Sequence, residues 1–283
     1  MPRSIPSLAR RQYLLQKSMK CLGLKRDVGE LFEVLDDLFV FALTPTYLLH
    51  DDADNPLEHH TTVLGNMMEI ATGEGLDWST VRQAAAIALL HDIWPVRKIT
   101  SDRIRNAPDH EKAAMEEERK DSVPIHQQEG SAHAREILDQ LNQKRGKVEY
   151  DAAAIERICS VIAIHDNPRI GIPIPTADTL AVAFREADRL WMQDPWGVGA
   201  DLARKGNNYP SRRDRLAQAQ ENVRSFHEER AKAYAAFPPA HFIDAETLFR
   251  TNTGHRIFGR LRRYWEFERL RTESQAVEAD ADH

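Results

Sequence analysis

The stretch AAAIALLHDIW, residues 84–94, decides the fold of this chain. Seven apolar residues run directly into His91 and Asp92, and Pro95 follows soon after. A segment that is apolar on all sides is typical of a buried helix, and the proline ends it within about one turn. Burying a carboxylate costs several kcal/mol unless a partner compensates its charge. A metal cation is the simplest partner for both side chains, and the partial negative charge of a helix C-terminus favours it.

The same pattern occurs a second time in the chain. Residues 155–164 read IERICSVIAI, another apolar helical stretch, and His165 and Asp166 follow it just before Pro168. This repetition favours a common role for the two helix ends.

The overall charge bears on the kind of partner that the protein binds. The formal net charge is −6, with 29% charged residues, so the chain has no general basic footprint for a nucleic acid polymer. A local cluster of cations can still hold a small anionic substrate. We therefore expect a small-molecule ligand and no nucleic acid polymer.

Two further features concern the compartment. No apolar run approaches the roughly 20 residues that a membrane span needs, and the basic N-terminus lacks the pattern of a signal peptide. The two cysteines, Cys21 and Cys159, lie far apart, and Cys159 sits in an apolar helix as a buried thiol would. We expect a cytoplasmic protein with no membrane partner.

Apolar residues recur at helical spacing along most of the chain, and strand-like alternation is not evident, so the predicted fold class is all-α. Asp77 or Ser79 can cap the helix that leads to His91. The other expected helices cover residues 8–21, 28–42, 57–72, 126–141, 155–164, 176–191, 211–237 and 245–272.

The remaining segments are predicted from their composition. Residues 97–123 carry dense charge of both signs, which favours an exposed helix over a lid. Residues 194–210 contain several Gly and Pro and are predicted as a loop, and the acidic tail from Glu273 is predicted to fray. The expected organisation is N-terminal helices over 1–54, a central metal-binding domain over 55–200 and a helical extension over 201–283.

Several candidate ligands lie at helix ends or on buried helix faces. Asp188 follows Phe184 by four residues, so it shares the apolar face of its helix and needs a cation there. Imidazoles combined with carboxylates suit Fe, Mn, Zn, Co or Ni better than Mg or Ca. The complete candidate set is His59 (or His60), His91, Asp92, His126, His165 and Asp188.

The order His…His-Asp…Asp resembles the HD-domain superfamily of metal-dependent phosphohydrolases. The spacing from His59 to Val63 and Gly75 is similar to that family's first helix, IALLHDI to its second motif, and FREADRLW to its final motif. The resemblance covers about residues 55–195. It implies an HD-type helical bundle, with the segments before and after it as additional helices.

The resemblance also implies a ligand set. The family's metal ligands correspond to His59, His91, Asp92 and Asp188. Many members add two histidines that bind a second ion, and the corresponding positions are His126, in HQQEGSA, and His165. Asp92 would then bridge one ion to the other. The chain lacks the Gly-Tyr-Pro signature of the cyclic-di-GMP-degrading subgroup, so that substrate is not inferred.

The expected reaction is hydrolysis of a phosphoester or phosphoanhydride in a small molecule, most plausibly a nucleotide, by water activated on one or two divalent transition-metal ions. Asp92, or Asp166 behind His165, would accept a proton or orient a ligand. His60 is a candidate for supporting a ligand or contacting substrate. Four cations close to the motifs are candidates for phosphate binding: Arg97, Lys98, Arg169 and Arg189.

Two other functions are compatible with these residues. Some HD-type proteins hold a mixed-valent di-iron pair with the same ligand order and act as oxygenases. A non-catalytic signalling module with a structural metal is the second alternative. In either case, the helices over 211–272 could form a homodimer.

Overall fold

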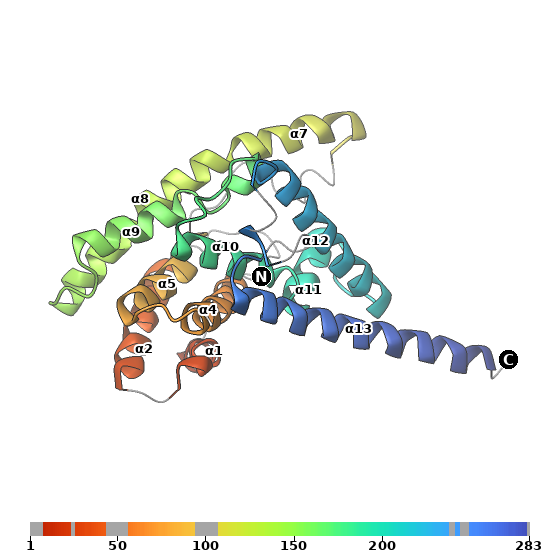
Figure 1. The fold of residues 1–283 in the computed structure, drawn as a ribbon, viewed down its shortest axis with the longest axis horizontal. Coiled ribbons are helices and arrows are strands. Elements are labelled where there is room, and N and C mark those ends of the chain that lie inside the picture. Colours follow the sequence, from red (N-terminus) through yellow and green to blue (C-terminus); the bar gives the residue numbers. More distant parts are fainter. Residues whose placement is uncertain are drawn as a thin grey trace.

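The computed structural model describes residues 8–23, 26–43, 56–93, 107–237, 241–243 and 249–281. Every regular element within these residues is helical, which confirms the all-α class (Figure 1). None of the described helices combines the length and apolar character that crossing a membrane requires.

Three helices form the centre of the core. α4 (Pro56–Gly73) packs against both α5 (Trp78–Leu90) and α10 (Thr179–Trp191). α9 (Ala152–Ile162) packs on α5, and α8 (Val123–Arg145) packs on α9. The ends of these helices are where the predicted ligands lie, so this arrangement positions the site.

The prediction that α5 is buried on all sides is confirmed. Its residues from Ala84 to Leu90 are completely inaccessible to solvent. Asp77 is the N-cap, because its side chain accepts a hydrogen bond from the Thr80 backbone N–H. The small alanines allow α4, α9 and α2 to approach α5 closely.

The N-terminal helices pack on this core. α1 (Leu8–Ser18) continues into a 3-10 turn, η1 (Lys20–Leu22), and lies on α4. α2 (Arg26–Leu38) continues into a π-helical turn, η2 (Phe39–Leu43), and packs on α5 and α8. Leu31, Leu35 and Leu38, which share one side of α2, are buried in the core.

Two predictions about the segments outside the core were wrong. Residues 194–210 are not a loop throughout, because α11 (Pro195–Arg204) begins there with Asp194 as its N-cap. The tail beyond Glu273 is helical, since α13 (Asn252–Ala281) continues through it. Within the charged segment 97–123, the expected helix is α7 (Asp109–Asp121), and residues 97–106 lie outside the described residues.

The C-terminal helices attach to the core in two ways. α12 (Arg212–Ala233) and α13 pack around a small cluster that contains Val198, Leu202, Ala219 and Trp265. The two residues that precede α13 are also anchored on α10, because the Glu186 carboxylate accepts hydrogen bonds from the backbone N–H groups of Arg250 and Thr251. Burial raises the pKa of Glu186 to about 7, and those hydrogen bonds oppose the rise.

Beyond this anchor, α13 runs outward to the C-terminus, past the other helices (Figure 1). It leaves Tyr264, Phe267 and Leu270 exposed. These side chains are available for the predicted homodimer contact, which stays a prediction.

The connection from α10 to α11 leaves no space for a side chain at Gly197. A methyl group at this position would overlap the backbone carbonyl of Trp191, whereas one at Gly199, two residues later in α11, would meet no atom within 4 Å. We expect Gly197→Ala to destabilise the protein by about 2 kcal/mol through overpacking. Gly199→Ala should stabilise it by about 0.5–1 kcal/mol, because alanine is the better helix former. Urea unfolding of both variants checks this, and equal stabilities would contradict the described α10–α11 turn.

Candidate metal centre

The candidate ligands come from five places in the chain that the fold brings together. His59 lies in the first turn of α4, and His91 is the C-cap of α5, with Asp92 directly after it. His126 lies in the first turn of α8, His165 follows the end of α9, and Asp188 lies in α10. The buried helices aim short side chains at one region because most of these residues sit at helix ends.

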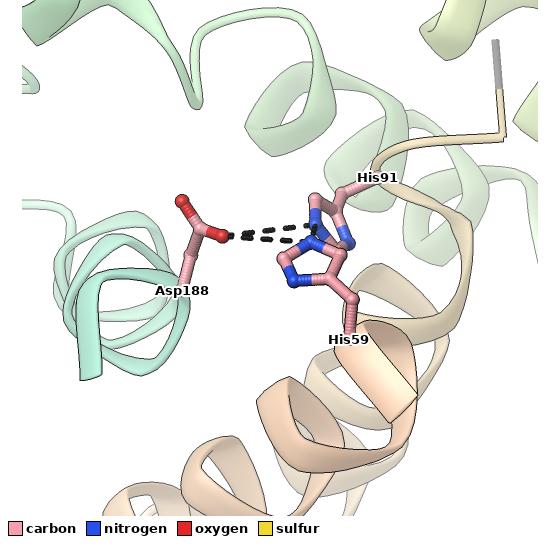
Figure 2. A group of neighbouring side chains, drawn as sticks. All are labelled: His59, His91 and Asp188. Atoms are coloured by element: carbon pink, nitrogen blue, oxygen red, sulfur yellow. Dashed lines mark hydrogen bonds and ion pairs between the residues drawn. The ribbon is translucent and has the colours of Figure 1, made fainter. Parts of the chain in front are cut away.

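The first group consists of His59, His91 and Asp188, which point toward one another (Figure 2). The Oδ1 atom of Asp188 lies 3.8 Å from the Nε2 atom of His59 and 3.8 Å from that of His91. The two Nε2 atoms are 2.9 Å apart. Three potential ligand atoms therefore surround one point, from helices far apart in sequence.

The second group consists of Asp92, His126 and His165. The Oδ1 atom of Asp92 lies 3.1 Å from His126 Nε2 and 3.4 Å from His165 Nε2. Both imidazoles are buried, whereas the Asp92 side chain is 36% exposed.

Asp92 connects the two groups through its two oxygens. While Oδ1 faces His126 and His165, Oδ2 lies 3.2 Å from His59 Nε2 and 3.4 Å from His91 Nε2. One carboxylate is thus shared between two pairs of imidazoles, which is the arrangement expected of a bridging ligand.

The hydrogen bonds of the rings fit metal binding. His91 Nδ1 lies 3.1 Å from the Ala88 carbonyl, and His165 Nδ1 lies 2.7 Å from the Ile162 carbonyl. A neutral imidazole that donates from Nδ1 has its lone pair on Nε2, the atom that faces the centre. The close approach of the His59 and His91 Nε2 atoms also needs a proton or a cation between two lone pairs. The buried clusters could therefore hold metal ions, and their donors suit a transition metal.

The electrostatics keep the carboxylates charged. Burial alone would raise the pKa of Asp92, but the charge of His91 and hydrogen bonds from the histidine rings hold it well below its usual range. Burial would likewise raise the pKa of Asp188, yet Arg189 and Arg185 lower it. The pKa of His91 is raised, because the Asp92 and Asp188 carboxylates outweigh the effect of burial.

Asp166 lies next to the second group and pairs with arginines. Its Oδ2 is 3.9 Å from His165 Nε2 and 2.9 Å from Arg169 Nη1, and its Oδ1 is 3.0 Å from Arg185 Nη1. Burial would raise its pKa, but Arg169, His165 and Arg185 hold it well below the usual range.

The other predicted site residues differ in their burial and in their partners. His60 is buried behind His59 and His91, with Nδ1 3.4 Å from the Ala88 carbonyl, and burial holds its pKa well below the usual range. Arg169 is 41% exposed beside Asp166, whereas Arg189 is mostly buried and pairs with Glu229. Arg97 and Lys98 lie outside the described residues.

Two residues of this region were missed in the sequence. Arg185 reaches both Asp166 and Asp188, and Glu229 of α12 holds Arg185. The position of Arg185, one helical turn before Asp188, could have indicated it. Glu229 carries no local signal, because only the packing of α12 brings it to α10.

Comparisons with protein-family models, with curated proteins and with solved structures find no match for this chain.

The shared position of Asp92 predicts unequal effects of two substitutions. We expect Asp92→Asn to weaken ion binding to both groups by at least about 100-fold, since it removes a ligand and a negative charge from each. Asp188→Asn should affect only the ion of the first group. Elemental analysis after loading with Mn²⁺ or Fe²⁺ measures both effects. Asp109→Asn, at a side chain that is 96% exposed, is the control. Equal metal content in all four proteins would show that these residues hold no ion.

Proposed function

We propose that this protein is an HD-type metal-dependent phosphohydrolase that cleaves a phosphoester or phosphoanhydride of a small molecule such as a nucleotide. One observation carries the proposal: the two oxygens of Asp92 face two separate pairs of histidines, 3.1 to 3.4 Å away. A pair of cations around a shared carboxylate is suited to in-line displacement at phosphorus.

The order of the ligands supports the family assignment. His59, the His91–Asp92 pair and Asp188 meet at one end of the α4, α5 and α10 helices, in the sequence order that the HD superfamily uses. His126 and His165 complete a second group. The proposal therefore rests on motif order together with convergence in space.

The residues of the chain have distinct roles in this proposal. His59, His91, Asp92 and Asp188 would hold the first ion, and Asp92, His126 and His165 the second. Divalent transition-metal ions would lower the pKa of a bound water molecule and offset the negative charge of phosphoryl oxygens. The backbone carbonyls of Ala88 and Ile162 keep the rings of His91 and His165 oriented with Nε2 toward the centre.

A partly exposed arginine beside the second group is suited to an anion. Arg169 uses Nη1 for Asp166, and its exposed remainder is free to approach a phosphate from solvent. We propose Arg169 as the first phosphate contact. Contacts from Arg97, Lys98, Arg189 or His60 to substrate stay predictions.

Asp92 and Asp166 have the roles of charged anchors rather than of strong bases. A carboxylate whose pKa is held well below its usual range accepts a proton poorly near neutral pH. We propose that Asp166 orients Arg169 and Arg185, while Asp92 holds the two halves of the centre at a fixed separation. Proton acceptance by either residue stays a prediction.

Hydrolysis of a panel of phosphoesters and nucleotides by metal-loaded protein tests the proposal. We expect Asp92→Ala to lower the rate at least about a hundredfold, because each ~1.4 kcal/mol of lost transition-state stabilisation is tenfold in rate. Asp109→Asn should leave the rate unchanged.

Two outcomes would replace this function. Two bound irons with oxygen uptake on an organic substrate would favour the di-iron oxygenase, which the same ligands would serve. Stable metal without turnover on any substrate would favour a signalling module with a structural metal.

A further inference from the structure

A buried arginine stands between the two groups of ligands. Arg185 lies in α10, one turn before Asp188, and its side chain is 7% exposed. Its Nη1 atom lies 3.2 Å from Asp188 Oδ2 and 3.0 Å from Asp166 Oδ1. Such a guanidinium is always charged and offers donors in a rigid planar arrangement.

This contact divides the oxygens of Asp188. Oδ1 faces His59 and His91, each with Nε2 at 3.8 Å, while Oδ2 is occupied by Arg185. We propose that Arg185 is a positioning residue that restricts Asp188 to binding the first ion through one oxygen. The inference rests on the proposed metal centre but not on the hydrolytic reaction.

Glu229 of α12 holds the arginine in place. Its Oε1 atom lies 2.7 Å from Arg185 Nη2, and its Oε2 atom lies 2.7 Å from Arg189 Nη2. Arg185 therefore cannot swing away from Asp188 without giving up its own ion pair with the buried Glu229 carboxylate, which is costly. Through this contact the C-terminal extension takes part in shaping the metal centre.

The same guanidinium also contacts Asp166, which adjoins the second group. Asp166 follows His165 directly, and Arg185 Nη1 contacts it while contacting Asp188. The guanidinium thus links Asp188 of the first group to Asp166, the residue that follows His165. This tie helps to set the separation between the two groups.

One-oxygen binding has a chemical consequence. If Asp188 bound through both oxygens, it would fill a position around the first ion that a catalytic site keeps open for water or substrate. With Oδ2 held by Arg185, that position would stay available. Arg185 would thereby limit the number of oxygens that Asp188 offers to an ion, without touching the ion itself.

Cobalt substitution of the full-length protein tests this directly. The visible absorption of Co²⁺ weakens as its coordination number rises toward six, so a second oxygen from Asp188 lowers the absorbance per bound cobalt. We expect Arg185→Gln to lose absorbance per cobalt. Arg185→Lys keeps the positive charge but not the planar guanidinium, so we expect a smaller loss of absorbance per cobalt. Because it keeps a cation beside the buried carboxylates, it is the variant to measure if Arg185→Gln does not fold.

Arg224→Gln is the matched control, since Arg224 pairs with Glu221 on the exposed side of α12 and lies outside the network. It should retain the wild-type spectrum. A folded Arg185 variant that binds as much cobalt as wild type and gives the same spectrum would overturn the inference. An equal change in Arg224→Gln would overturn it too.

The outcome separates this inference from the proposed reaction. Wild-type protein that binds cobalt but hydrolyses no phosphoester would refute the phosphohydrolase and leave the spectral comparison valid. Wild-type protein that binds no cobalt in elemental analysis would overturn the metal centre and this inference together.

Discussion

The contact on which the rest of the structure depends is that of one aspartate with four imidazoles. Asp92 directs Oδ2 to His59 and His91 and Oδ1 to His126 and His165. Placing a charged carboxylate beside buried rings costs several kcal/mol unless each polar atom has a partner. Four chain segments must therefore meet at Asp92, and the helices that carry them are packed to make this possible.

The packing around α10 extends this constraint to the C-terminal part of the chain. α10 presents Asp188 to the candidate metal centre, Arg185 to Glu229 of α12, and Glu186 to the backbone just before α13. Successive helix positions differ by about 100°, so one short helix can address three neighbours at once. The C-terminal helices are in this way joined to the centre by buried polar contacts as well as by apolar packing.

Much of the fold and of the candidate ligand set could be predicted because their signals are local. The apolar run before His91, the cap at Asp77 and the face of α10 that carries Asp188 each follow from spacing within one helix. Prediction failed for α11, where Pro195, Gly197 and Gly199 resemble a loop although Asp194 caps a helix. Gly197 is needed there because α11 passes against the backbone of Trp191, which is a contact between helices.

The sequence by itself determined an all-helical chain whose helix ends carry imidazoles and carboxylates in an order typical of metal binding. Only the tertiary structure decided which oxygen of Asp92 meets which histidines, and that Arg185 occupies the second oxygen of Asp188. The reason is physical. Helical periodicity relates residues a few positions apart, whereas distances of about 3 Å between side chains of α4, α5, α8, α10 and α12 depend on how whole helices pack.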